Sequence, residues 1–420
     1  MRKLIKNVNV FDGKNRELLE HHYIVIEDNL VAEISTGEIS EDNFDEVIDG
    51  RNQYAIPGLT DTHVHLGRIT DYQGHNNLEY SLVLTPRITA KLLAHGITTV
   101  RDAGGITVGL KQAIDEGLVD GPRIYPSNAY ISQTCGHGDN DERKRNRDIQ
   151  YRIPSSGVLA DGVPEVLRAV REQFYRGASQ IKIMAGGGMS SEHDPVATVQ
   201  FTYEEMKAIV DATADYGTYV MAHLYTPECM KRAIKAGVKS LEHAHAMDDE
   251  TARMIQAEDV FVTPMPQFTE EEIKWNHMGS YADYVSYKKK KPGANDVKAK
   301  TAYATELINK YDLKILFGTD MMVTYPDYEP RQGLDFKEYK KRFGSYKGIV
   351  SATGNVNDLI KLTTYQNPYP EGEIGVLKKG SFADILVIQG NPVEDLELLY
   401  DVNNIQLIMK DGKVYKNTLS

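Results

Sequence analysis

The chain has 420 residues, of which 41% are hydrophobic and 26% are charged, and its formal net charge at pH 7 is -12. This length allows one large α/β unit with a smaller satellite domain. The negative charge argues against nucleic acid or an anionic membrane surface as a partner, because both require a positive patch on the protein.

The cysteine content and the apolar segments bear on where the protein works. Only Cys135 and Cys229 occur, too few for a disulfide framework in a chain of this size. No stretch reaches the roughly 18 apolar residues that a membrane span requires. The first residues lack the apolar centre of a secretory signal, because Lys6 and Asn7 interrupt it. We therefore expect a cytoplasmic protein.

Both ends of the sequence carry the pattern of small antiparallel strands. Residues 1–54 alternate apolar and polar in short runs, separated by turn signals such as Asp12-Gly13. Residues 374–420 do the same, with Asp411-Gly412 between two apolar runs. We expect the two ends to join in one small β-sandwich domain.

Between these ends, residues 55–373 alternate short β-branched runs with helical stretches. Such runs are typical of strands with both faces buried, and a helix at 202–216 opens with the capping-box sequence Thr202-Tyr203-Glu204-Glu205. Eight strands alternating with helices predict an α/β fold of the (β/α)8 TIM-barrel type. The expected strands are 55–62, 97–102, 123–131, 179–184, 218–223, 238–242, 259–263 and 313–318, and the expected helices include 164–176, 202–216, 227–236 and 296–311.

A polar insert, residues 132–161, follows the third expected strand. It is rich in glycine and arginine, which favours an active-site loop over a linker. Arg143, Arg145, Arg147 and Arg152 in this insert are candidates for binding a substrate carboxylate, although arginines on such loops are more often simply solvated.

Six residues that can bind metal come at the ends of separate expected strands: His63, His65, Lys182, His223, His243 and Asp320. In TIM barrels the chemistry lies at the C-terminal ends of the strands, where loops from different strands converge. His63 and His65 are two apart on an extended strand, so their side chains share one face. A lone strand-end histidine is more often a core residue, and an aspartate there is commonly a helix cap. The six together, in this order, indicate a metal-dependent hydrolase.

The run P-G-L-T-D-T-H-V-H at 57–65 resembles the amidohydrolase superfamily. Within the superfamily, the chain is most similar to the imidazolonepropionase-related group, which includes Xaa-Pro and Xaa-Arg/Lys dipeptidases and ochratoxin-cleaving amidases. Further matching motifs are T-T-V-R-D-A-G-G at 98–105, S-Q-I-K-I-M-A-G-G-G at 179–188, A-H-L-Y at 222–225, L-E-H at 241–243, F-G-T-D at 317–320 and G-S-F-A-D-I-L-V-I at 380–388.

The resemblance implies two divalent metal ions, usually zinc. It assigns His63, His65 and Asp320 to one ion and His223 and His243 to the other. The remaining residue, Lys182, would bridge both ions after carboxylation of its amine by carbon dioxide. A protonated ammonium cannot bind a cation, whereas a carbamate is an anionic, carboxylate-like ligand, and a buried lysine loses its proton readily.

Two further residues would complete a catalytic site in the resembling enzymes. Tyr225 lies two residues after His223 and would contact the substrate; the alternative is a tyrosine packed at the barrel rim. His137, in the G-H-G-D motif at 136–139, would polarise the scissile carbonyl; the alternative is an ordinary loop histidine. His245 could share the face of His243, but the motif match ends at His243, so we do not expect it to be a ligand. Cys135 has no obvious base nearby in the sequence, which argues against a nucleophilic role.

The implied reaction is amide hydrolysis. Two cations that share an oxygen ligand depress the pKa of the water between them, so that hydroxide is available to attack the carbonyl. Asp320 would then carry the proton to the leaving amine. The implied substrates are dipeptides or N-acyl amino acids, and relatives of this group are commonly homo-oligomers. Two alternatives stay open: a mononuclear deaminase or cyclic-amide hydrolase on the same fold, and a non-catalytic scaffold, which retention of all six ligands disfavours.

Overall fold

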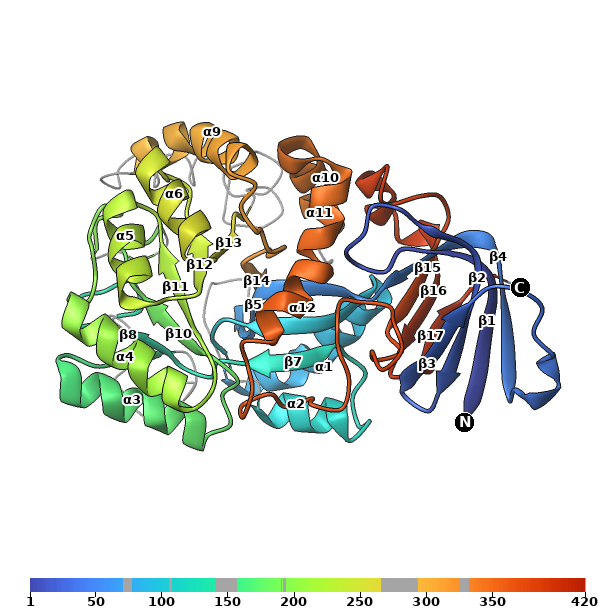
Figure 1. Ribbon diagram of the computed structural model, residues 1–420. Helices are drawn as coiled ribbons and strands as arrows, with labels where there is room; N and C mark the ends of the chain where they lie inside the picture. Colours follow the sequence, from blue (N-terminus) through green and yellow to red (C-terminus); the bar gives the residue numbers. More distant parts are fainter. Residues whose placement is uncertain are drawn as a thin grey trace.

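The computed structural model describes residues 1–70, 78–105, 108–139, 157–189, 191, 194–265, 294–324 and 332–419. The described strands form three sheets, of seven, six and four strands. The seven-stranded sheet contains both chain ends and stands beside the helix-covered part of the molecule (Figure 1). We call it the terminal sheet.

The terminal sheet has the strand order β17-β16-β15-β4-β1-β2-β3. Its central strand β4 pairs parallel with β1 and antiparallel with β15, so the two chain ends share one hydrogen-bonded layer. The Asp411-Gly412 turn of the β16–β17 hairpin is present, with positive φ at both residues. A second, facing sheet is not found among the described strands of the two ends, so the sandwich and the domain boundaries stay predictions. The strands are β1 (Arg2–Val10), β2 (Leu19–Glu27), β3 (Leu30–Ser35), β4 (Glu46–Pro57), β15 (Ile385–Ile388), β16 (Ile405–Lys410) and β17 (Lys413–Asn417).

The other two sheets are entirely parallel in their described pairings, as expected for strands joined through helices. Their orders are β13-β12-β11-β10-β8-β9 and β14-β5-β6-β7. β4 continues into β5 with only Gly58 between them, so one extended segment passes from the terminal sheet into a parallel sheet. The strands are β5 (Leu59–Thr70), β6 (Ile97–Asp102), β7 (Arg123–Pro126), β8 (Tyr130–Ser132), β9 (Gly157–Leu159), β10 (Ile181–Met184), β11 (Val220–Leu224), β12 (Ser240–His243), β13 (Phe261–Thr263) and β14 (Met321–Thr324).

The eighth expected strand, 313–318, differs from the prediction. It makes only an isolated bridge, between Ile315 and Val262, and no continuous ladder. The amide of Phe317 donates instead to the Ser351 carbonyl oxygen (2.9 Å), which draws it out of strand pairing. The segment still connects the two parallel sheets, because Leu316 donates to the Val262 carbonyl and Thr62 donates to the Phe317 carbonyl, each at 2.8 Å.

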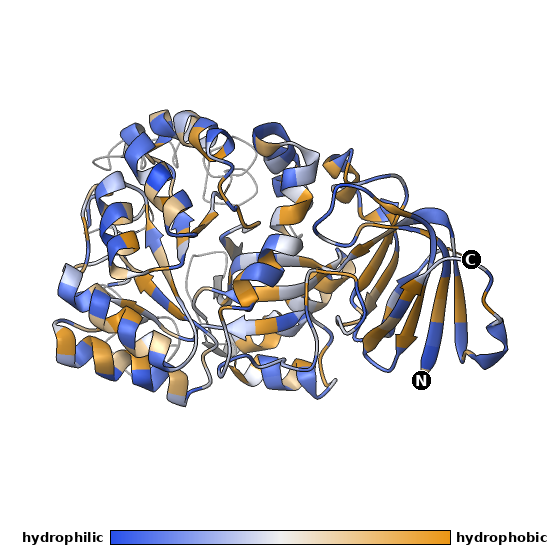
Figure 2. Ribbon diagram, in the orientation of Figure 1, coloured by the Kyte–Doolittle hydropathy of each residue, from blue (hydrophilic) through white to orange (hydrophobic). Residues whose placement is uncertain are grey.

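Helices surround the parallel sheets and carry both polar and apolar residues along their lengths, as helices with one buried face do (Figures 1 and 2). The capping box of α4 is present as predicted, with Thr202 accepting from the Glu205 amide. The α-helices are α1 (Leu78–Ala94), α2 (Val108–Asp115), α3 (Val163–Tyr175), α4 (Tyr203–Asp215), α5 (Pro227–Ala236), α6 (Asp249–Ala257), α9 (Ala294–Lys310), α10 (Gln332–Phe343), α11 (Ser345–Ser351) and α12 (Gly354–Ile360), and the 3-10 turns are η1 (Glu41–Asn43), η4 (Leu396–Leu399) and η5 (Val402–Asn404).

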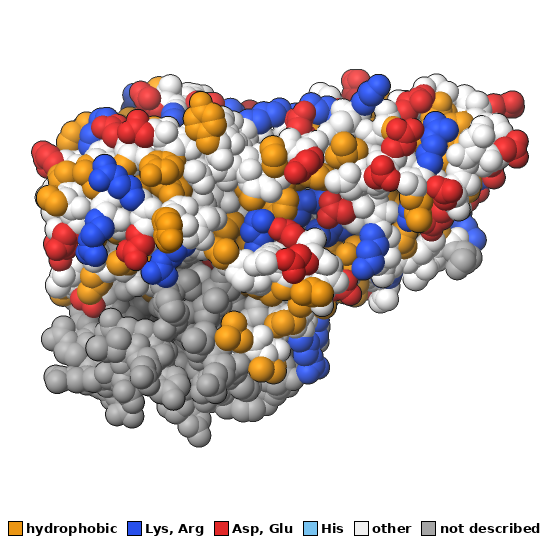
Figure 3. All heavy atoms as spheres, turned by 90° about the horizontal axis from the view of Figure 1, so that it is seen from below, with side chains coloured by type: hydrophobic (Ala, Val, Ile, Leu, Met, Phe, Trp, Pro, Cys, Tyr) orange, Lys and Arg blue, Asp and Glu red, His pale blue; other side chains and the backbone are white. Residues whose placement is uncertain are grey.

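Charged side chains of both signs lie on the described surface. On the face shown in Figure 3, Lys and Arg side chains are interspersed with Asp and Glu side chains and do not gather into one basic patch. None of the described helices has the length and apolar character that crossing a membrane would require.

Arg123 on β7 ties the parallel sheet to the terminal sheet. Its side chain is 1% exposed, forms ion pairs with Asp384 and Asp411, and lies 3.9 Å from the centroid of the Phe382 ring. Asp384 directly precedes β15, and Asp411 lies in the β16–β17 turn. A single buried guanidinium therefore neutralises two carboxylates from the other layer.

Replacing Arg123 by methionine is expected to destabilise the protein by about 3–5 kcal/mol. The buried carboxylate of Asp384 loses its counter-charge, and the half-buried carboxylate of Asp411 loses its ion pair with Arg123. Urea unfolding followed by circular dichroism measures the change. The matched control is Arg176→Met, whose partner Glu172 is 40% exposed and whose pair should contribute less than about 1 kcal/mol. Equal effects of the two substitutions would show that Arg123 does not join the layers energetically.

Candidate metal centre

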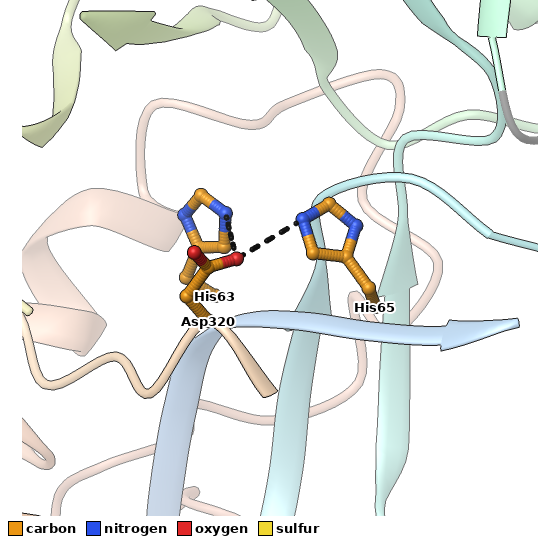
Figure 4. Close-up of side chains that lie close together, drawn as sticks. All are labelled: His63, His65 and Asp320. Atoms are coloured by element: carbon orange, nitrogen blue, oxygen red, sulfur yellow. Dashed lines mark ion pairs between the residues drawn. The ribbon is translucent and has the colours of Figure 1, made fainter. Parts of the chain in front are cut away.

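Three potential ligands meet at the middle of β5. His63 and His65 both lie on β5 and are 1% and 4% exposed, while Asp320 directly precedes β14. The Asp320 Oδ1 atom lies 3.6 Å from Nε2 of His63 and 3.3 Å from Nε2 of His65. Figure 4 shows both imidazole rings turned toward this carboxylate. One donor atom from each residue lies within 4.8 Å of the others, which is close enough for all three to bind one ion.

The second nitrogen of each ring is held by the protein. Nδ1 of His65 donates to the Gly104 carbonyl oxygen at 2.8 Å, since a carbonyl can only accept. Nδ1 of His63 lies 2.7 Å from Oε2 of Glu242. In both rings the proton is thus placed on Nδ1, and Nε2 presents a lone pair toward Asp320, the arrangement that metal-bound histidines adopt.

Glu242 is itself held in a buried polar network. Its Oε1 accepts from Nη2 of Arg101 at 2.9 Å and from Oγ of Ser240 at 2.6 Å. Arg101 and Glu242 are 1% and 0% exposed, so this ion pair connects β6 to β12 inside the molecule. Because one carboxylate serves both Arg101 and His63, the ring orientation of His63 is fixed by the interior of the fold.

The backbone conformation and the charge of Asp320 both fit a metal ligand. Its φ is +53°, in the left-handed region, and its amide donates to the His63 carbonyl oxygen at 2.8 Å. Burial would raise the pKa of Asp320, but its contacts with His65, His63 and Lys182 outweigh burial and hold the pKa well below its usual range. Asp320 is therefore an anion at neutral pH, as a metal ligand must be.

Lys182 on β10 reaches the same place from the opposite sheet. It is 1% exposed, and its Nζ lies 3.3 Å from Nε2 of His63. Burial lowers its pKa from 10.5 to about 8, although Glu242 and Asp320 act in the opposite direction. A substantial neutral fraction of this amine is therefore present near neutral pH, and only the neutral amine can react with carbon dioxide.

His223 and His243 lie on neighbouring strands, β11 and β12, where Leu224 pairs with His243. Their ring centroids are 4.4 Å apart, and the His243 ring is 5.5 Å from that of His63. Burial, followed by neighbouring histidines and Lys182, lowers the pKa of both well below 6.5, so both rings are neutral. Nε2 of His223 is buried and has no hydrogen-bond partner among the described residues.

His137 and Tyr225 both reach this cluster. The His137 ring stacks on His223, with centroids 4.1 Å apart and planes at 15°. Tyr225 is 2% exposed, and its ring lies 5.1 Å from that of His223 and 4.9 Å from that of His243. In contrast, Nε2 of His245 contacts the Met265 carbonyl oxygen at 3.0 Å, which commits that nitrogen to the backbone.

The donor set fits divalent metal. It offers neutral imidazoles, one anionic carboxylate and a buried lysine within contact of one another, and imidazole and carboxylate together suit zinc and similar ions. The buried Nε2 of His223, which lacks a partner within the described part of the chain, is the kind of atom that a metal ion would satisfy. All eight residues that the sequence nominated are brought together, whereas Arg143, Arg145, Arg147 and Arg152 lie outside the described residues.

Sequence reasoning missed the residues that support the ligands. Arg101 and Glu242 were inside the quoted motifs, but neither was given a role. Asp61 was missed as well, although its carboxylate accepts from the Thr319 hydroxyl at 2.7 Å and from the His63 amide at 3.1 Å. The available signal was a charged residue within an otherwise apolar strand, which demands a buried partner.

Comparison with known proteins adds independent findings. A sequence profile of the amidohydrolase family matches residues 54–415. The ochratoxinase of Aspergillus niger is 31% identical over 380 aligned positions, covering 86% of this chain and 75% of the relative. A 5-methylthioadenosine/S-adenosylhomocysteine deaminase of Halothermothrix orenii is 39% identical over 424 aligned positions, covering 92% and 85%. The crystal structure of a prolidase complexed with N-methylphosphonate-L-proline is similar at a TM-score of 0.87 and 31% identity, covering 99% and 100%.

Proposed function

The chain belongs to the amidohydrolase family, and from this premise we propose that it cleaves the amide bond of a dipeptide or an N-acyl amino acid with the help of two divalent metal ions, zinc in the first instance. As a member of this family it is a hydrolase of amide bonds. The narrower substrate class is supported by the similarity to an ochratoxinase and to a prolidase whose bound ligand is a proline derivative.

One observation carries the two-metal proposal: Lys182 lies buried between two groups of ligands. Its Nζ is 3.3 Å from His63, and its charge is among the causes that lower the pKa of His223 and His243, after burial itself. As an ammonium, Lys182 could not bind a metal ion beside these histidines. Carboxylated at Nζ, Lys182 would supply two oxygen atoms, one for each group of ligands.

The ligands divide into two sets. His63, His65 and Asp320 would hold one ion, His223 and His243 would hold the other, and carboxylated Lys182 would be a ligand to both. When bound, two such cations supply a water of lowered pKa and polarise the amide carbonyl. Glu242 and the Gly104 carbonyl keep the Nε2 atoms of His63 and His65 directed at the site.

The remaining steps belong to the side chains. Asp320, an anion held between His63 and His65, accepts the proton of the attacking water at its carboxylate and passes it to the nitrogen of the leaving amine. His137 and Tyr225, which flank His223, contact the substrate and steady the oxygen of the carbonyl under attack.

We also propose that the two parallel sheets form one closed (β/α)8 barrel, residues 55–373, with the site at its C-terminal rim and a terminal domain made of residues 1–54 and 374–420. The hydrogen bonds that Leu316 makes to Val262, and Thr62 to Phe317, support this because they span the junction between the sheets. Every proposed ligand then lies where active sites of such barrels occur.

Metal analysis followed by a hydrolysis screen tests the function. The purified protein, loaded with zinc, is expected to hold about two ions per chain and to cleave at least one substrate among Xaa-Pro, Xaa-Arg and Xaa-Phe dipeptides and N-acyl amino acids. Release of the free amine is followed by reaction with ninhydrin. Failure of the zinc-loaded protein to cleave any amide would overturn the proposal.

The similarity to a deaminase favours one alternative function, a mononuclear deaminase. Ammonia release from aminopurine nucleosides, with about one ion per chain and no signal from Lys182 after growth in labelled bicarbonate, would support it. Two ions per chain with a carboxylated lysine would exclude it.

A further inference from the structure

The face of the His137 ring is set by packing against two residues. On one side the ring stacks on His223. Gly188, which follows β10, also lies against it: a Cβ atom at this position would stand 1.8 Å from Cε1 and 1.9 Å from Nδ1 of His137. A side chain at position 188 would clash with the ring, so glycine is required there for His137 to adopt this position.

The edge of the ring is set by a polar chain. Nδ1 of His137 lies 2.8 Å from Oγ of Ser191, and Ser191 in turn donates to Oδ1 of Asp194. Nδ1 is also 3.7 Å from Oδ2 of Asp194. Ser191 is 6% exposed and Asp194 is 2% exposed, so water competes little for these contacts.

The direction of these hydrogen bonds follows from counting protons. A serine hydroxyl has one proton to give, and a carboxylate can only accept. The Ser191 proton therefore goes to Asp194, and the Ser191 oxygen accepts from Nδ1–H of His137. This chain of hydrogen bonds requires a proton on Nδ1, so any contact with substrate is made through Nε2. Nε2 donates to a carbonyl oxygen only when it carries a proton as well.

Two further hydrogen bonds hold the carboxylate of Asp194 in place. Its Oδ2 accepts from the Gly188 amide at 2.8 Å and from Nε2 of Gln200 at 3.1 Å. The other end of the Gln200 side chain accepts from the His137 amide at 2.9 Å. The segment between β10 and α4 therefore holds both the ring and the backbone of His137.

We propose that Asp194, acting through Ser191, is a positioning residue that fixes the Nδ1–H state and the orientation of His137 toward the substrate carbonyl. The proposal rests on the proposed function, in which His137 contacts the substrate. The described contacts of Asp194 are with Gly188, Ser191, Gln200 and His137, none of which is a proposed metal ligand.

A double-mutant cycle tests the coupling. Asp194→Asn is expected to lower kcat by about 10–100-fold with a smaller change in KM and unchanged metal content. In a His137→Ala background the same substitution should cost nothing further, because its effect passes through that ring. The matched control is Asp161→Asn, since Asp161 holds Thr134 of the same loop without reaching the ring, and its kcat should stay within about twofold. Effects of Asp194→Asn and His137→Ala that multiply would overturn the proposal.

A second measurement does not depend on activity. In protein labelled with 15N-histidine, two-bond 1H–15N spectra should show a proton on Nδ1 of His137, with the signal assigned by its loss in His137→Asn. Ser191→Ala should change this signal and leave those of the other histidines in place. A wild-type ring with an unprotonated Nδ1 would overturn the proposal even if the enzyme is active. If no amide is cleaved at all, the proposed function fails and these spectra still decide the role of Asp194.

Discussion

Replacing Lys182 by alanine is expected to reduce bound metal from about two ions to one or fewer and to lower kcat/KM by about 1,000-fold, or about 4 kcal/mol of transition-state stabilisation. The reason is the position of Nζ, which is buried and lies 3.3 Å from Nε2 of His63 within the proposed site. Plasma emission spectrometry and steady-state kinetics on the same preparation measure both quantities.

Chemical rescue separates carboxylation of Lys182 from a purely structural role. Acetate or propionate should restore part of the activity of Lys182→Ala by supplying the missing carboxylate, whereas alkylamines should not. In the wild-type apoprotein, uptake of 13C-bicarbonate at Lys182 should rise as the pH rises through about 8, where burial has placed the pKa of this amine, because only its neutral form reacts. Rescue by amines alone would contradict the carbamate. Lys231→Ala, at a partly exposed ion pair with Asp248, serves as the control.

Asp320→Asn is expected to retain most of the metal yet lower kcat by about 100- to 10,000-fold, the range that loss of a general base produces. His63, His65 and the remaining ligands still hold the ions, but an amide cannot accept the proton of the attacking water. Metal content and kcat are measured together. Asp248→Asn, an exposed carboxylate that caps α6, is the matched control and should turn over normally. An Asp320→Asn enzyme with near-normal kcat would rule out the proton transfer.

The candidate ligands could be predicted because they lie in or just after short runs that identify buried strands, in the expected order along the chain. β6 and α5 have the bounds that were expected, and most of the other elements differ by a few residues. Two expected strands were wrong: 123–131 is divided into β7 and β8, which lie in different sheets, and 313–318 makes only an isolated bridge. The expected barrel would bring His63 and His243 together, because the ends of its strands converge, and the two rings do lie 5.5 Å apart.

The residues that hold the candidate ligands in position were not predictable in the same way. Arg101 and Glu242 are obvious as charged residues in apolar strands, but nothing in the sequence says that they pair with each other across the interior. Ser191 and Asp194 lie in a loop, where spacing carries no periodic signal and distances depend on the chain path. The segment 313–318 has the composition of a strand, but Ser351 competes for its backbone, and that competition arises only in the folded chain.

The continuity of β4 and β5 has a consequence for how the protein is made. The extended segment that presents His63 and His65 also forms the middle of the terminal sheet, where β15 lies alongside β4. β15 and β16 are synthesised only after almost all of the rest of the chain. A nascent chain on the ribosome therefore carries His63 and His65 on a segment whose β4 part lacks one of its two neighbours, β15, until translation is nearly finished. Long-range pairing of this kind folds slowly and leaves strand edges open to aggregation. Production of active protein should accordingly depend more on the integrity of residues 385–410 than their distance in sequence from the ligands would suggest.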